Sequence, residues 1–328
     1  MNNRRKLVIA LGAGALVAPL ASFGQQQAKI FRIGFLHPSS ATLSTSRVVA
    51  LRSGLRDYGY VEGKNLAIEF RWADGNYERL PELAAELVRV NVDVIVTSGT
   101  PSTRAAKEAT TTLPIVMTVT GDAVGSGLIA SLARPGGNLT GATYFDPELT
   151  GKRFELLKEA VPRIAHLAAF VNPLNPQAMG TALQALQVVT KVKKVALEVF
   201  EARGPNEFDN AFSAMAKKRV DAVEVVDDAM FISNFKAIAT LAASKRLPST
   251  GTKEFAEAGG LIGYGVSFDA THNRAAYFID RIFKGAKPSD LPVEQATRFE
   301  LVVNLTTAKA LGIKIPESIL LQANKLIE

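Results

Sequence analysis

The chain has 328 residues, of which 47% are hydrophobic and 21% charged, and it contains no cysteine. This length allows one large core or, more typically, two cores of about 150 residues each, and the hydrophobic content excludes an intrinsically disordered chain. The lack of cysteine excludes a disulfide scaffold, a cysteine nucleophile and thiolate zinc ligands. With only three histidines, the chain offers little for a metal site, and we predict neither metal nor cofactor.

Residues 1–27 have the pattern of an export signal. Arg4, Arg5 and Lys6 precede an apolar run over 7–21, and small residues before Gln25 form a cleavage site. The run is shorter than the roughly 20 apolar residues that a membrane span needs. We therefore predict a cleaved signal peptide and a periplasmic mature protein, while the paired arginines leave the Sec and twin-arginine routes both open. Removing the three basic residues lowers the net charge from +7 to +4.

The first half of the mature chain alternates predicted strands and helices. Apolar runs predict strands over 30–36, 66–72, 92–97 and 114–119. Apolar residues at helical spacing predict helices over 48–58, 78–90, 102–109 and 124–132. The run over 92–97 is continuous, which is typical of a parallel strand covered on both faces. The alternation predicts a doubly wound parallel sheet.

A short strand over 141–144 and a long helix over 147–161 follow the turn cluster at 134–138. A second series of strands and helices then begins at residue 166. Further strands are predicted over 166–171, 195–200, 221–226 and 261–264, and helices over 176–189, 206–217, 231–243 and 273–283. The tail adds a strand over 299–303 and helices over 306–311 and 317–327. The sequence thus predicts two similar α/β halves.

Small polar residues follow the predicted strands, where ligands bind in open parallel sheets. In the first half these are Ser39, Ser40, Ser98, Gly99, Thr100 and Asp122, and in the second half Asn172, Asn175, Asp227 and Tyr264. Residues 98–100 combine hydroxyls with backbone N–H groups at a helix start, which suits a carboxylate. Helix capping is the alternative role for each Ser, Thr, Asn and Asp. Taken together, the residues predict a polar cleft between the halves.

The common catalytic motifs are absent from the sequence. It has no Gly-x-Ser-x-Gly elbow and no His-Glu-x-x-His, and the glycines of 121–127 do not follow the dinucleotide-binding order. We assign structural roles to His37, His166 and His272. The basic clusters at 191–194 and 217–219 follow helices and have few aromatic neighbours, so we predict no nucleic-acid binding.

Several motifs resemble those of ABC-transporter substrate-binding proteins of the tryptophan/tyrosine type. They are 59–66 (GYVEGKNL), 97–101 (TSGTP), 125–141 (GSGLIASLARPGGNLTG), 260–265 (GLIGYG) and 291–304 with its FELVVN segment. The resemblance covers nearly the whole mature chain, in order. It implies the type I periplasmic binding protein fold, with two Rossmann-like lobes, parallel sheets and three crossing segments.

The resemblance also implies how the chain is divided and what it contacts. We expect a first lobe over 28–144, to which about 267–288 returns, and a second lobe over 145–266, to which about 289–328 returns. The partners would be a small-molecule ligand and an ABC permease in the inner membrane, and the protein itself a monomer. Phe145, Phe231 and Tyr264 are candidates for contacts with an aromatic ligand.

The leading hypothesis is therefore a periplasmic receptor that binds an amino-acid-like solute, unaltered, between its lobes. The ligand carboxylate would bind at 98–100, and its ammonium at Asp227 or, second, at Asp122. One alternative is a periplasmic sensing domain with the same fold. The other is a secreted α/β hydrolase that uses Asp227 or Asp228 as an acid–base, which would need a nucleophile or a metal nearby.

Overall fold

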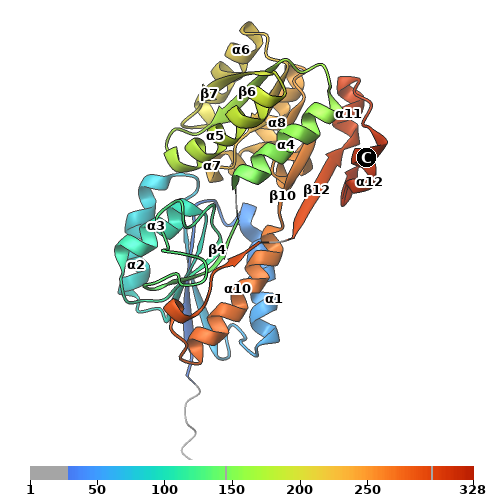
Figure 1. Ribbon diagram of the computed structural model, residues 1–328. Helices are drawn as coiled ribbons and strands as arrows, with labels where there is room; N and C mark the ends of the chain where they lie inside the picture. Colours follow the sequence, from blue (N-terminus) through green and yellow to red (C-terminus); the bar gives the residue numbers. More distant parts are fainter. Residues whose placement is uncertain (1–28, 145, 297) are drawn as a thin grey trace, which may run out of the picture. The chain divides into compact units, whose positions relative to one another are not determined.

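The computed structural model describes residues 29–144, 146–296 and 298–328, so the predicted signal peptide lies outside the described residues. The chain forms two sheets in which nearly all strand pairs are parallel, with helices between successive strands (Figure 1). The α/β class and the two-lobed organisation around parallel sheets, which the sequence predicts, are confirmed. We call the sheet that contains β1 and its helices the first lobe, and the other the second lobe.

The first lobe contains a six-stranded parallel sheet in the order β11-β5-β4-β3-β1-β2. Its strands are β1 (Phe31–His37), β2 (Leu66–Trp72), β3 (Val94–Ser98), β4 (Ile115–Val119), β5 (Leu139–Thr143) and β11 (Glu294–Gln295). Its α-helices are α1 (Thr45–Asp57), α2 (Leu80–Arg89), α3 (Thr100–Ala109) and α10 (Phe268–Phe283). Short 3₁₀ turns are η1 (Thr42–Ser44), η2 (Tyr77–Arg79) and η4 (Pro288–Asp290).

Alternation along the strands divides the first lobe into two apolar layers. On one face, Phe35 and Val96 pack with Leu51 of α1 and Ala276 of α10. On the other face, residues such as Ile95 pack with α2 and α3. Both layers are buried, which explains the continuous apolar runs of the central strands. Helices that are distant in sequence, α1 and α10, thus share one face of this sheet.

The second lobe contains seven strands in the order β13-β12-β10-β9-β8-β6-β7. They are β6 (His166–Val171), β7 (Ala196–Glu201), β8 (Ala222–Val225), β9 (Ser249–Gly251), β10 (Ile262–Val266), β12 (Phe299–Asn304) and β13 (Lys325–Ile327). Only the β10–β12 pair is antiparallel among the described pairs. The helices are α4 (Asp146–Ala160), α5 (Pro176–Val192), α6 (Phe208–Lys217), α7 (Ala229–Ser233), α8 (Phe235–Ser244), α9 (Lys253–Glu257), α11 (Leu305–Leu311) and α12 (Glu317–Gln322), with the 3₁₀ turn η3 (Pro205–Glu207).

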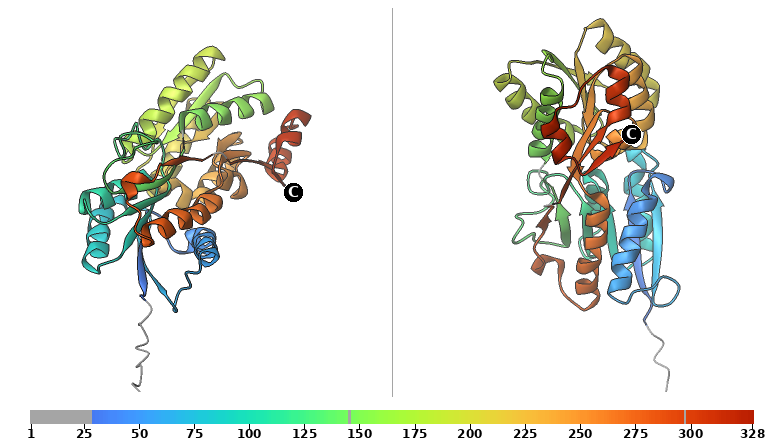
Figure 2. Two further views of the ribbon diagram at one scale, coloured as in Figure 1. Left: turned by 60° about the horizontal axis from the view of Figure 1, so that its bottom comes forward. Right: turned by 90° about the vertical axis from the view of Figure 1, so that its right-hand side faces the viewer.

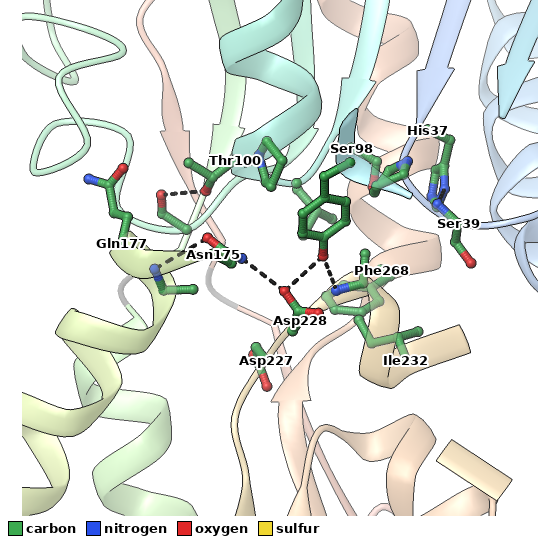
Figure 3. Close-up of a pocket in the computed structure, with 18 of the residues that line it drawn as sticks. His37, Ser39, Ser98, Thr100, Asn175, Gln177, Asp227, Asp228, Ile232 and Phe268 are labelled. Carbon is green, nitrogen blue, oxygen red and sulfur yellow. Dashed lines mark hydrogen bonds between the residues drawn. The ribbon is translucent and has the colours of Figure 1, made fainter. Parts of the chain in front are cut away.

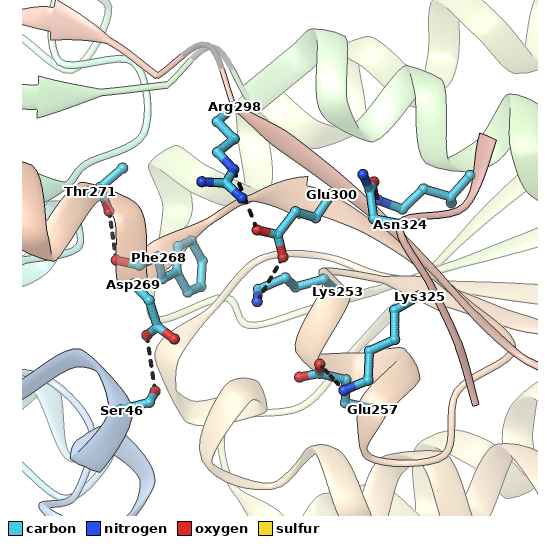
Figure 4. Close-up of polar contacts among 11 residues, drawn as sticks. Ser46, Lys253, Glu257, Phe268, Asp269, Thr271, Arg298, Glu300, Asn324 and Lys325 are labelled. Atoms are coloured by element: carbon cyan, nitrogen blue, oxygen red, sulfur yellow. Dashed lines mark hydrogen bonds and ion pairs between the residues drawn. The ribbon is translucent and has the colours of Figure 1, made fainter. Parts of the chain in front are cut away.

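The chain passes between the two sheets three times: before α4, between β10 and α10, and between β11 and β12 (Figure 2). The third passage differs from the sequence expectation, which placed residues from about 289 onward in the second lobe. β11 pairs with β5, so the chain leaves the first sheet only after Gln295. Close to this passage, Glu300 pairs with Lys253 at 3.0 Å and with Arg298 at 4.0 Å (Figure 4).

Two local predictions were wrong, and two short strands were missed. Residues 124–132 form turns instead of a helix, because Gly127 has a φ of 67° and the Asp122 carboxylate accepts the Gly125 N–H. The predicted last helix ends at Gln322, and the chain then forms β13. The strands β9 and β11 were not predicted, since two or three residues are too few to show a period.

None of the helices in the described ranges combines the length and the apolar character that a membrane crossing requires.

Candidate functional site

A pocket lies at the carboxyl ends of the parallel strands and takes residues from both lobes. The first lobe contributes the segments after β1, β3, β4 and β5, and the second lobe those after β6 and β8. Figure 3 shows Ser98, Thr100 and His37 of the first lobe facing Asn175, Asp227 and Asp228 of the second. This is the edge of a parallel sheet where loops and helix starts meet, so polar groups gather there.

The turn after β3 presents the start of α3 to this pocket. Gly99 has a φ of 80°, a conformation that favours glycine, and the chain turns there directly into α3. Gly99 supplies no side-chain cap, and the next helical residue after Thr100 is Pro101. The side chains of Ser98 and Thr100 lie in the wall beside this helix start. Hydroxyls at the positive end of a helix dipole favour an anionic group such as a carboxylate.

In the second lobe, Asp228 is the centre of a buried hydrogen-bond network. Its carboxylate accepts from Asn172 Nδ2 at 3.0 Å, from Asn175 Nδ2 at 3.1 Å and from the Met230 N–H at 3.0 Å. Burial raises the pKa of Asp228, while the bonds from Asn172, Tyr77 and Asn175 act in the opposite direction. Asp228 therefore organises the pocket floor and caps α7.

Asp227, the neighbouring residue, forms a bidentate ion pair with Arg153. Arg153 is fully buried and donates to the two carboxylate oxygens at 2.6 and 2.9 Å. It also donates through Nε to the Tyr264 carbonyl at 2.5 Å and lies 3.8 Å from Glu224. Asp227, which the sequence predicted to bind the ligand ammonium, is thus already paired with a buried cation. Adjacent Asp227 and Asp228 use their carboxylates in separate networks.

Direct hydrogen bonds join the lobes around the pocket. The Ser39 and Ser233 hydroxyls are 2.7 Å apart. On the opposite side, Arg104 donates to Gln177 Oε1 at 2.7 Å, and Gln177 Nε2 donates to the Gly125 carbonyl at 3.3 Å. The Tyr77 hydroxyl donates to Asp228 Oδ2 and accepts from the Ala229 N–H. The structure therefore holds the two lobes in contact on either side of the pocket.

Seven of the ten residues that the sequence singled out line this pocket: Ser39, Ser98, Gly99, Thr100, Asp122, Asn175 and Asp227. The other three do not line it. Asn172 lies behind the wall and orients Asp228, and Ser40 follows the lining residue Ser39. The Tyr264 side chain packs beside Phe299, at 6.0 Å between ring centroids, and against the cluster that contains the lining residues Tyr144 and Phe268, without lining the pocket itself.

The aromatic residues that line the pocket differ from those that the sequence suggested for contact with an aromatic ligand. Phe231 is buried in the second-lobe core, where it stacks on Phe170 at 4.4 Å, and Phe145 lies outside the described residues. The aromatic residues that do line the pocket are Tyr77, Tyr144 and Phe268. Each belongs to a segment between regular elements or to a helix start, so no periodicity pointed to it. His37 also lines the pocket and is buried, where we expected only a structural role.

No group of three or more acidic or histidine side chains is placed to bind a metal ion in the described ranges.

Comparisons with known proteins show which family and which folds the chain matches. The family model for ABC transporter substrate binding proteins matches residues 37–327. A tyrosine-binding protein of Clostridioides difficile is 28% identical over 263 residues, which cover 79% of this chain and 74% of that protein.

Solved structures match nearly the whole chain. A conserved domain protein of Vibrio cholerae has a TM-score of 0.85 at 28% identity and covers 91% of this chain and 100% of its own. An ABC domain of Streptococcus pneumoniae in complex with L-Trp has a TM-score of 0.81 at 27% identity and covers 90% and 100%. Two more distant structures, at 16% and 11% identity, share the fold with TM-scores of 0.58 and 0.60. The predicted type I periplasmic binding protein architecture is thereby confirmed.

Proposed function

Since this chain belongs to the family of ABC transporter substrate binding proteins, we propose that it binds an amino-acid-like, aromatic solute between its lobes. It would release the solute unaltered to an ABC permease of the inner membrane. The observation that carries the proposal is the pocket itself, lined by polar groups of both lobes and bordered by direct bonds between them. The names of the tyrosine-binding and L-Trp-bound relatives support an aromatic amino acid.

The pocket offers complementary groups for such a ligand. Ser98, Gly99 and Thr100 at the start of α3 suit the carboxylate. Asp122 suits the ammonium better than Asp227, because both carboxylate oxygens of Asp227 already accept from Arg153. Tyr77, Tyr144 and Phe268 provide apolar surface for a ring. Ser39 and Asn175 complete the proposed contacts.

Binding would act through closure of the lobes. A ligand that touches groups of both lobes stabilises only the closed arrangement, so it shifts the population towards that arrangement. No bond needs to form or break, and the acids at the end of β8 have structural partners that occupy them. We further propose export by a cleaved signal peptide, by either route, and action as a monomer in the periplasm.

Thermal unfolding and calorimetry with a solute panel test this function. The protein is first partly unfolded and refolded to remove solutes carried through purification, which mass spectrometry identifies. At a ligand concentration 100 times Kd, binding stabilises by about 2.7 kcal/mol, so we expect L-tyrosine or L-tryptophan to raise Tm by several degrees. The bound amino acid should be recovered chemically unchanged. If no amino acid raises Tm, or if the bound solute is converted, the proposal fails.

A further inference from the structure

We propose that Arg47 is the residue that selects ligands with a free carboxylate, by pairing with that carboxylate in the pocket. This inference rests on the proposed function and names the cation that the sequence-based assignment lacked. Arg47 is the third residue of α1, lines the pocket and is only 7% exposed. Among the described lining residues it is the only lysine or arginine, whereas Asp122, Asp227 and Asp228 are all acidic.

Arg47 lies beside the proposed carboxylate position. Leu36 pairs with Thr97, so His37 and Ser98 are the next residues of two neighbouring strands. By alternation their side chains point to the face that Phe35 and Val96 share with α1 and α10. Arg47 reaches this point from α1, with Nη1 3.3 Å from His37 Nε2. An anion bound at the start of α3, next to Ser98, would therefore lie close to the Arg47 guanidinium.

Arg47 has no anionic partner among the residues that the structure describes. Its guanidinium stacks over the Phe268 ring at 4.8 Å from the centroid. Glu254 and Asp269 influence its charge at longer range, but neither forms an ion pair with it in the described part of the chain. The Asp269 carboxylate instead accepts from Ser46, at 3.0 Å (Figure 4). A buried cation without an ion pair is unfavourable, and a ligand carboxylate would remove that cost.

His37 does not supply the missing acceptor. The Ser39 N–H donates to His37 Nδ1 at 3.1 Å, and a neutral imidazole carries one proton, so that proton lies on Nε2. Burial, followed by the charge of Arg47, holds the pKa of His37 well below its usual value, so the ring is neutral. Nε2 therefore faces Arg47 with its N–H. Apart from this ring, no described residue forms a hydrogen bond with the Arg47 guanidinium, so Nε and Nη2 remain available to a ligand.

The test compares ligands that differ only in the carboxylate. Affinities of L-tyrosine and tyramine, and of L-tryptophan and tryptamine, are measured by calorimetry for the wild type and for Arg47→Met. In the wild type we expect the amino acids to bind about tenfold to a hundredfold more tightly than the amines, as for a charge-assisted pair. In Arg47→Met the two members of each pair should bind within about threefold of each other. Arg56→Met, which removes an exposed arginine of the same helix, should keep the wild-type ratio.

The stability of the ligand-free variant gives a second readout. Because Arg47 lacks an ion pair without ligand, Arg47→Met should unfold at the same temperature as the wild type or higher. A marked loss of stability would overturn the inference, as would an unchanged amino acid to amine ratio. If the wild type binds no amino acid, the proposed function fails together with the inference. If the wild type binds and the ratio persists in Arg47→Met, the inference alone fails.

Discussion

The Tyr77 hydroxyl, in the first lobe, donates a hydrogen bond of 2.7 Å to Asp228 Oδ2, in the second lobe. The Tyr77 hydroxyl oxygen also accepts from the Ala229 N–H at 2.9 Å and lies 3.3 Å from the Met230 nitrogen. Burial is the main cause that raises the pKa of Tyr77 well above its usual value, so the phenol keeps its proton. One side chain thus joins the first lobe to the start of α7, next to the pocket.

Replacing Tyr77 by Phe should favour separation of the lobes. The substitution removes the donor to Asp228 and the acceptor for Ala229, which should cost the closed arrangement about 1–3 kcal/mol. The affinity for the solute should fall by about fivefold to a hundredfold, and small-angle scattering of the ligand-free protein should give a larger radius. Tyr58→Phe, at a tyrosine that is 41% exposed, should change neither. Unchanged affinity in Tyr77→Phe would show that this contact does not control closure.

Arg153→Met should strongly destabilise the protein. The substitution leaves Asp227 and Glu224 as buried carboxylates without their shared cation, which typically costs about 3–5 kcal/mol. Urea unfolding, followed by circular dichroism, measures the loss. The control is Arg203→Met, where a side chain that is 57% exposed pairs with Glu201 and Glu207 and contributes at most about 1 kcal/mol. A loss of less than about 1 kcal/mol in Arg153→Met would contradict the prediction.

His272 should make the protein less stable in mild acid. Burial, and next the charge of Arg47, lowers its pKa to about 3, against 6.5 in an exposed chain. Between these values the unfolded chain binds a proton that the folded protein excludes, so stability falls as the pH falls from about 6.5 towards 3. At about pH 5 the expected cost is about 2 kcal/mol.

Urea unfolding at several pH values checks this dependence. His272→Gln removes the titrating group, so the slope of stability against pH should become smaller. It should not vanish, because burial also lowers the pKa of His37 in the same direction. An identical slope in His272→Gln would refute the assignment.

Two glycines should respond to alanine in opposite ways. Gly141 in β5 has a φ of 122°, and an added Cβ would overlap the Met117 backbone, so Gly141→Ala should cost at least about 2 kcal/mol. Gly180 lies exposed within α5, with open space around its Cβ position. Gly180→Ala should stabilise by about 0.5–1 kcal/mol because alanine favours the helix. Thermal unfolding of both variants measures these stability changes. If both variants were stabilised or both destabilised, the prediction would be wrong.

The sequence predicted the regular elements well because the long apolar runs and amphipathic helices have clear periods. It failed over 124–132, where two glycines and the turn at Asp122 outweigh an apolar pattern. It also failed for β9, β11 and β13, whose few residues pair only because longer strands lie beside them. Such pairing is a tertiary effect that no local pattern contains.

The site was predictable where it follows strand ends and was not predictable elsewhere. Ser98 and Asp227 come directly after strands, so topology brings them to the pocket edge. Tyr77 and Phe268 reach the same pocket from a 3₁₀ turn and a helix start far along the chain. Arg47 looked like one of many surface charges, since burial of a helix face by α10 is visible only in the folded chain.

The position of β11 and β13 at the ends of the two sheets has a consequence for biogenesis. Residues 294–295 complete the first sheet and 325–327 the second, so a nascent chain lacks part of each sheet until these residues have been synthesised. A chain that stops before β12 would leave the antiparallel edge of β10 unpaired, and such edges promote aggregation. Native folding of each lobe therefore waits for a strand that is made after the rest of its sheet.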